Sequence, residues 1–216
     1  MNEKSENLDK KILKDPTCYK CDCSTHCSIG TPNKELENCP TNMSPEIQKK
    51  AIKLYETDEF IRKSNFAATI AKYQGSVPRL KDTIEYAKRM EFKKIGIASC
   101  AALQKETKIT VKALHKYGFE VSSVCCPTGV KKKIEIDIPK EFKSYLGKGY
   151  NLDTITCNPV AQALLLNKAK TDLNIIIGLC IGHDVTFTYL SEAPVTTLIA
   201  KDRFFRHNPA ATLTSF

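Results

Sequence analysis

The chain of 216 residues is 42% hydrophobic and carries a formal net charge of +9. It is long enough for one sizeable domain with a small appendage, and no run approaches the ~18 apolar residues of a membrane-spanning helix. Residues 1–16 lack the apolar core of a secretory signal, which predicts a cytoplasmic protein. Most lysines are spread along predicted helix faces and no nucleic-acid-binding motif is present. We therefore expect neither nucleic acid nor a membrane as a partner.

The ten cysteines form two groups. Thiols stay reduced in the cytoplasm, where clustered cysteines indicate metal or redox chemistry. The alternative, a secreted disulfide scaffold, is disfavoured by the missing signal and by the long apolar strands. The first group is local in sequence and comprises Cys18, Cys21, Cys23, Cys27 and Cys39. The second group is dispersed and comprises Cys100, Cys125, Cys126, Cys157 and Cys180.

Residues 1–44 are predicted to be a cysteine-rich metal-binding segment. Residues 18–44 have few apolar side chains and cannot build a core without a staple. The spacing C-x2-C-x-C-x3-C, followed by a later Cys-Pro, is typical of a metal site, and zinc prefers four such ligands in a tetrahedron. An unstructured cysteine-rich tail is the alternative. The expected ligands are Cys18, Cys21, Cys27 and Cys39, with Cys23 or His26 as spare or exchanging ligands.

A helical linker is predicted over residues 45–76. Ser44 is a suitable N-cap and Pro45 a suitable first helical residue. Apolar residues then recur with helical spacing, break near Asp58 and resume as far as Tyr73. We expect two consecutive helices.

Helices and strands alternate from residue 77 to residue 216, which indicates an α/β domain. Strands separated by helices of this length predict right-handed crossovers and a mostly parallel, Rossmann-like three-layer sheet. Residues 127–156 are irregular and are expected to form a long excursion or lid. The predicted strands are 93–99, 119–125, 173–180 and 194–200. The predicted helices are 80–90, 101–117, 159–169 with Asn158 as N-cap, and 184–190.

The dispersed cysteines all lie where a predicted strand ends or a helix begins. Ligands of open parallel sheets bind outside the carboxyl ends of the strands, and a nearby helix N-terminus lowers a thiol pKa. His183 adds an imidazole that can bind a metal or donate a proton. The predicted cofactor-binding residues are Cys100, Cys125, Cys126, Cys157, Cys180 and His183, with Cys180 and His183 as catalytic candidates.

The type of cofactor follows from the ligands. Soft thiolates select zinc, copper(I) or iron–sulfur clusters. Thiolates from different loops suit a 4Fe-4S cubane at least as well as a tetrahedral zinc, and a cluster held by three cysteines leaves one iron open to a substrate. The alternative is that these are buried free cysteines of an ordinary core.

Other chemistries are less well supported. Neither phosphate-binding glycine motif occurs at a strand end, which argues against nucleotide binding, and no nucleophile elbow is present. A Cys–His hydrolase is a remaining alternative, in which Cys180 or Cys157 would pair with His183 or His207.

A family resemblance is carried by KKIGIASCAALQKE, FEVSSVCCPTG, TCNPVAQALLLN, LNIIIGLCIGHDVTF and APVTTLIAKDRFFRHNP, which span roughly residues 77–210. The chain resembles the family of uncharacterised metal-binding proteins catalogued as domain of unknown function 1847. The resemblance implies metal binding without an established reaction.

The segment APVTTLIAKDRFFRHNP continues past the final predicted strand. Its basic residues could turn toward the same sheet edge to bind an anion. Ordinary surface charges around a C-terminal helix are the alternative. The candidates are Lys201, Arg203, Arg206 and His207, and Asn208–Pro209 are expected to cap a short final helix.

The first functional hypothesis is a metal-binding protein with an iron–sulfur cluster at the sheet edge for redox or sulfur chemistry. It would act with an electron-transfer partner or on a small, for example sulfur-containing, substrate. One alternative is a non-catalytic zinc-binding storage or sensor module. Another is a metal-free thiol enzyme that uses Cys125, Cys126 or Cys180 as its nucleophile.

Overall fold

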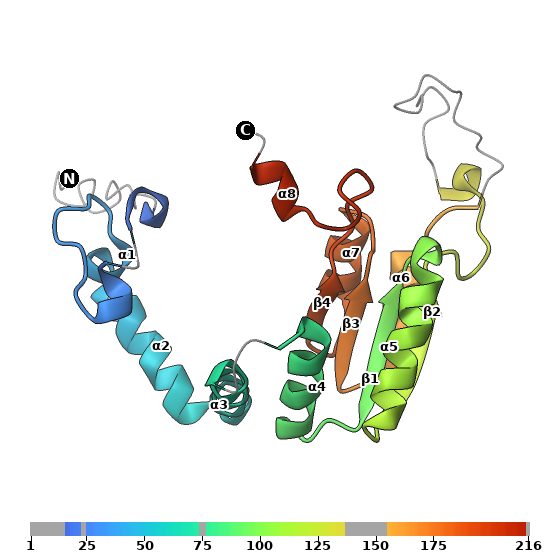
Figure 1. Cartoon of the computed structure of the whole chain (residues 1–216), viewed down its shortest axis with the longest axis horizontal. Coiled ribbons are helices and arrows are strands. Elements are labelled where there is room, and N and C mark those ends of the chain that lie inside the picture. The colour runs from blue at the N-terminus through green and yellow to red at the C-terminus, as the bar shows by residue number, and fades with distance from the viewer. Residues whose placement is uncertain (1–15, 23–24, 74–76, 137–154, 215–216) are drawn as a thin grey trace, which may run out of the picture. The chain divides into compact units, whose positions relative to one another are not determined.

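The computed structural model describes residues 16–22, 25–73, 77–136 and 155–214 (Figure 1). The chain divides into two compact units between Asn65 and Phe66. Most of the expected lid lies outside the described residues. Its described part includes the 3-10 helix η4 (Lys133–Ile136) and an antiparallel bridge between Lys132 and Ile155. Within the described ranges, no helix is both long and apolar enough to cross a membrane.

The first unit consists of short helices. It contains η1 (Cys18–Lys20), η2 (Cys27–Ile29), α1 (Pro40–Met43), α2 (Pro45–Thr57) and the start of α3 (Glu59–Tyr73). The predicted break between two helices is confirmed, because Asp58 has an extended backbone and its carboxylate accepts a hydrogen bond from the Ile61 amide at 2.9 Å. Ser44 occupies the N-cap position of α2, although its hydroxyl makes no capping bond.

The second unit is built on a four-stranded parallel sheet, as predicted. The strands are β1 (Lys94–Ser99), β2 (Glu120–Cys125), β3 (Leu173–Ile177) and β4 (Val195–Ile199), in the order β2-β1-β3-β4. β3 ends three residues earlier than expected. Gly178 has a φ of +64°, and a Cβ there would lie 1.9 Å from Leu103 Cδ1, so the chain turns out of the sheet where a side chain has no room.

Helices cover both faces of this sheet (Figure 1). One face packs against α4 (Arg79–Arg89) and α5 (Gln104–Lys116), through a core that includes Ile84, Ile97 and Leu114. The other face packs against α6 (Pro159–Lys168) and α7 (His183–Leu190), through Leu166, Ile176 and Phe187. The helix predicted at 101–117 is divided into η3 (Ala101–Leu103) and α5.

The two central strands, β1 and β3, are almost fully buried, whereas the edge strands β2 and β4 are partly exposed. This explains why β1 and β3 read as continuous apolar runs. After β1 the chain moves outward to β2 and then returns to β3 on the other side of β1. The carboxyl ends of β1 and β3 therefore flank the point where the winding reverses, which is the usual ligand position in such sheets.

Candidate functional site

Cys100 stands at the centre of a cluster of thiols at this reversal point. It follows β1 directly, and its amide donates to the Ile177 carbonyl of β3 at 3.0 Å. Its side chain is buried in the core between the sheet and α6, together with Cys126. Lys201, which follows β4, donates from Nζ to Cys100 Sγ at 2.8 Å.

The vicinal pair Cys125–Cys126 is split between the two faces of the sheet. Successive side chains of a strand point to opposite faces. Cys125 therefore lies on the α5 side, where Gln104 Nε2 donates to its sulfur at 3.0 Å. Cys126 lies on the α6 side, is hydrogen-bonded to Cys100 and Cys157, and accepts a hydrogen bond from the Ala101 amide at 3.4 Å. Only one member of the pair joins the thiol cluster.

Cys157 and Cys180 complete the cluster from two further segments. Cys157 precedes α6 in a loop held by the Asn158 amide, which donates to the Cys126 carbonyl at 2.7 Å. Cys180 precedes α7, and its carbonyl accepts from the His183 and Asp184 amides. Electrostatic interactions connect Cys157 with both Cys180 and Cys100. We call Cys100, Cys126, Cys157 and Cys180 the thiol site.

The terminal cations predicted to bind an anion divide into two pairs. Lys201 and Arg203 turn toward the thiol site, and Arg203 Nη2 donates to Cys180 Sγ at 3.2 Å. His207 instead closes its own loop, because its Nδ1 accepts from the Asp202 amide at 3.2 Å and its amide donates to the Asp202 carbonyl. Arg206 is exposed. Pro209 occupies the N-cap position of α8 (Ala210–Leu213), and no side chain makes a capping bond there.

The thiols of the site differ in acidity. Burial acts to raise the pKa of Cys100, but the hydrogen bond and positive charge of Lys201, with a backbone hydrogen bond from Ala102, outweigh it and lower that pKa. Burial raises the pKa of Cys126 to about 12. Burial also raises the pKa of Cys157. The arrangement therefore favours the thiolate form of Cys100 and the protonated forms of Cys126 and Cys157.

Gln162 is a positioning residue that the sequence reasoning missed. This fully buried side chain of α6 donates from Nε2 to the carbonyls of Ser99, at 3.2 Å, and Val124, at 2.7 Å. It thus ties together the ends of β1 and β2 just before Cys100 and Cys125. The available signal was a single polar residue one helical turn before the apolar Leu166.

The donor chemistry of the thiol site matches a soft metal or an iron–sulfur cluster, since sulfur ligands with hydrogen bonds to sulfur are typical of both. The geometry of the thiol site gives less support for a bound metal than its donor chemistry does. Among the described residues, no three cysteine, histidine, aspartate or glutamate side chains are placed together as ligands of one metal ion. In the present arrangement Cys100 and Cys180 contact cations of the protein.

Among the described N-terminal residues, the cysteines are not placed together as a group of three or more metal ligands. Cys39 is buried, Cys27 Sγ is 3.5 Å from Thr41 Oγ1, and Asn33 Nδ2 donates to Cys21 Sγ at 3.8 Å. Among the described residues, Cys18, Cys21, Cys27 and Cys39 form no disulfide bond, and Cys23 lies outside the described residues. The predicted zinc site in this segment stays a prediction.

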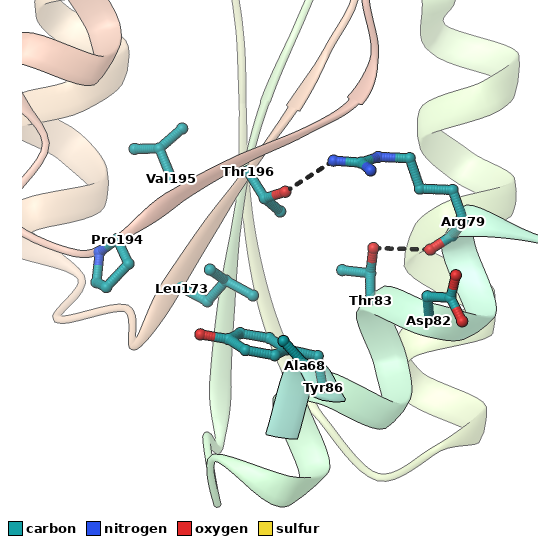
Figure 2. Close-up of a pocket in the computed structure, with 9 residues that line it drawn as sticks. All are labelled: Ala68, Arg79, Asp82, Thr83, Tyr86, Leu173, Pro194, Val195 and Thr196. Atoms are coloured by element: carbon teal, nitrogen blue, oxygen red, sulfur yellow. Dashed lines mark hydrogen bonds between the residues drawn. The ribbon is translucent and has the colours of Figure 1, made fainter. Parts of the chain in front are cut away.

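A separate cavity of about 570 Å³ lies at the opposite, amino edge of the sheet, beside the starts of β3 and β4 (Figure 2). No cysteine is among the described residues that line it. As Figure 2 shows, the Arg79 guanidinium points to β4, and it donates to Thr196 Oγ1 at 3.2 Å and to the Thr197 carbonyl at 2.7 Å. Arg79 therefore covers an exposed strand edge, which is a structural role.

Sequence comparison places the chain in a family. The profile described as "Protein of unknown function (DUF1847)" matches residues 39–198, a range that includes Cys39 and all five dispersed cysteines. An uncharacterized protein of Methanocaldococcus jannaschii is 43% identical over 183 residues, which cover 84% of this chain and 90% of that protein. Neither description names a metal, a cofactor or a reaction. With most of its length matched in both comparisons, the chain belongs to the DUF1847 family.

Proposed function

We propose that the protein binds a soft metal at the thiol site, with an iron–sulfur cluster as its main occupant, and uses it for redox or sulfur chemistry. The observation that carries the proposal is the convergence of four thiols from four separate segments at the reversal point of the sheet. Cys100 follows β1, Cys126 follows β2, Cys180 follows β3, and Cys157 precedes α6. An ordinary core does not require sulfur at each of these positions.

The surrounding charges support the same proposal. A cluster held by thiolates carries negative charge, and Lys201 and Arg203 supply two positive charges directly at sulfur atoms. Hydrogen bonds to sulfur tune the reduction potential of such clusters. Cys100, Cys126, Cys157 and Cys180 would hold the cluster. Held by all four, it would supply electron transfer, whereas held by three of them it would leave one Lewis-acidic iron open to a substrate.

The test is anaerobic purification and cluster reconstitution, followed by iron and acid-labile sulfide analysis and an absorbance spectrum. We expect C100S, C126S, C157S and C180S each to lower the bound iron. C125S is the matched control, because its sulfur lies on the other face with Gln104. Colourless protein after reconstitution, or equal iron loss in C125S, would overturn the proposal. C18S should leave this iron in place and affect only a separate N-terminal metal pool.

A second candidate function, metal-free thiol–disulfide exchange, is favoured by the unequal acidity of Cys100 and Cys126. The Cys100 thiolate would attack a disulfide substrate and release the first thiolate product. Cys126 would then lose its proton and attack the Cys100 sulfur, releasing the second thiolate. The protein dithiol is oxidised to a disulfide, and the substrate disulfide is reduced by the same two electrons.

This candidate is tested in metal-free protein with glutathione disulfide. Mass spectrometry should find a Cys100–Cys126 disulfide in the native chain and a trapped glutathione adduct on Cys100 in C126S. No adduct on Cys100 in C126S would exclude exchange as described here.

A further inference from the structure

A second cavity at the carboxyl edge of the sheet adjoins the thiol site. Its volume is about 660 Å³, which is within the range of small-molecule sites. Cys157 and Cys180 contribute to its wall, so a ligand inside would lie against two of the four sulfurs. The remaining wall comes from Ile155, Thr156 and Asn158 before α6, from the first turn of α6, from His183 at the start of α7, and from Lys131, Lys133 and Arg203.

The charged side chains among the described residues that line this cavity are cationic. Three of the lining side chains are cationic at neutral pH, and none of the described residues that line it is an aspartate or glutamate. Two nearby carboxylates are directed to backbone amides: Asp184 Oδ1 accepts from Val185, and Glu135 Oε2 accepts from Lys132, both at 2.8 Å. The cavity walls thus focus a positive potential.

The backbone that carries the two lysines is held by folded structure, and Arg203 is held through its side chain. The bridge between Lys132 and Ile155, with a 2.8 Å hydrogen bond from the Thr156 amide to the Lys131 carbonyl, joins the lysine segment to the segment that carries Cys157. Arg203 is held from the other side by its 3.2 Å hydrogen bond to Cys180. A guanidinium has five N–H donors, so a single bond to sulfur does not exhaust its capacity for hydrogen bonding.

We infer that this cavity binds a small anionic substrate, carrying a phosphate or carboxylate group, and holds it against Cys157 and Cys180. The inference deepens the proposed function by naming the substrate class of the thiol site. Anion binding itself depends on the cations and does not require a metal.

The test is calorimetric titration of the metal-free full chain with inorganic pyrophosphate and, separately, with citrate, which distinguishes a phosphate from a carboxylate ligand. We expect one saturable site for at least one of the two, with affinity that falls as salt is added. Replacing Lys131 with Gln should weaken binding by about fivefold or more, because a charge-assisted contact is lost. Lys112→Gln, an exposed charge on α5, is the matched control and should leave the affinity nearly unchanged.

A labelling experiment locates the bound anion. In the same metal-free protein, the anion should slow alkylation of Cys157 and Cys180 but not of Cys125. Absence of binding to both anions, equal losses in K131Q and K112Q, or binding without protection of Cys157 and Cys180 would each overturn the inference. If the anion binds and protects but reconstituted protein holds no iron and Cys100 forms no adduct in C126S, the inference stands and the proposed function fails.

Discussion

Lys201 Nζ lies 2.8 Å from Cys100 Sγ, although the two residues are 101 positions apart in the chain. Lys201 follows β4, at one edge of the sheet, and Cys100 follows β1, two strands away. The lysine must therefore reach across the carboxyl end of β3, so the contact exists only when the sheet is assembled. It is the main contact that lowers the pKa of Cys100.

Replacing Lys201 with Met should raise the pKa of Cys100. Burial already acts to raise it, and the variant removes the hydrogen bond and the charge that oppose burial. Because the thiolate is the reactive form, alkylation of Cys100 at pH 7 should slow several-fold in the metal-free protein, and the midpoint of its pH–rate profile should move upward. The measurement is residue-resolved mass spectrometry with iodoacetamide from pH 5 to 10. An unchanged midpoint in K201M, with K112M as control, would show that Lys201 does not set this acidity.

A different prediction concerns stability in alkali. The folded chain keeps Cys126 protonated up to a pKa of about 12, whereas a thiol of the unfolded chain ionises near pH ~8.5. Above that pH the unfolded state binds fewer protons than the folded state, so the free energy of unfolding falls as pH rises. Burial also raises the pKa of Cys157, so this thiol likewise lowers the free energy of unfolding as pH rises.

Cys126→Ser should therefore make the loss of stability between pH 8 and about 10 smaller than in the native chain. Urea unfolding of the metal-free, reduced proteins at several pH values gives the comparison, and C125S is the matched control. If the native chain and C126S lose stability equally over this interval, the Cys126 thiol is not held in its protonated form by the fold.

Much of this architecture could be predicted from local patterns. The apolar runs of β1 and β3 and the helix signal at Asn158 lie within short windows, and Asn158 Oδ1 does accept from the Ala161 amide at 2.9 Å. The convergence of cysteines was also predictable, because parallel strands place their carboxyl ends at one edge. The early end of β3 could not be predicted from a local pattern, because it depends on the contact between Gly178 and Leu103, which belong to different segments.

The partners of individual sulfurs depend on the order of strands, which no local pattern contains. Cys100 meets Lys201 only because β3 separates β1 from β4. By contrast, the placement of Cys125 and Cys126 on opposite faces could be predicted from the local pattern, because successive side chains of a strand alternate between the two faces. The five dispersed cysteines predicted as one set are therefore divided, with Cys125 on the α5 side of the sheet.

Gly96 offers a test of the packing beneath the thiol site. It lies on β1 opposite Asn174 of β3, and a Cβ at residue 96 would lie 1.9 Å from Asn174 Oδ1 and 3.1 Å from Leu166 Cδ1. Asn174 is fully buried and held by hydrogen bonds with Thr171 and Ser191, both at 2.8 Å, so it has little freedom to move.

Gly96→Ala should lower the free energy of unfolding by about 1–3 kcal/mol, the usual cost of overpacking a core. Denaturant unfolding measures the loss. Combining it with Asn174→Ala should cost less than the sum of the two single changes, because the smaller side chain makes room for the methyl group. Strict additivity, or a neutral G96A, would contradict the packing described here.

Gln162 should control the thiol site through its hydrogen bonds to the ends of β1 and β2. Its Nε2 donates to the carbonyls of Ser99 and Val124, so Gln162→Leu removes both hydrogen bonds. The Ser99 carbonyl still accepts from the Cys126 amide at 2.8 Å, and the variant also removes the buried, unpartnered Gln162 Oε1, so we expect a loss of about 1 kcal/mol of stability. The looser strand ends should also expose Cys126, and its alkylation in the metal-free protein should become several-fold faster. Gln104→Leu is the matched control, because that amide serves only the opposite face, at Cys125. Faster labelling of Cys126 in Q104L but not in Q162L would assign the positioning of the site to the α5 face instead.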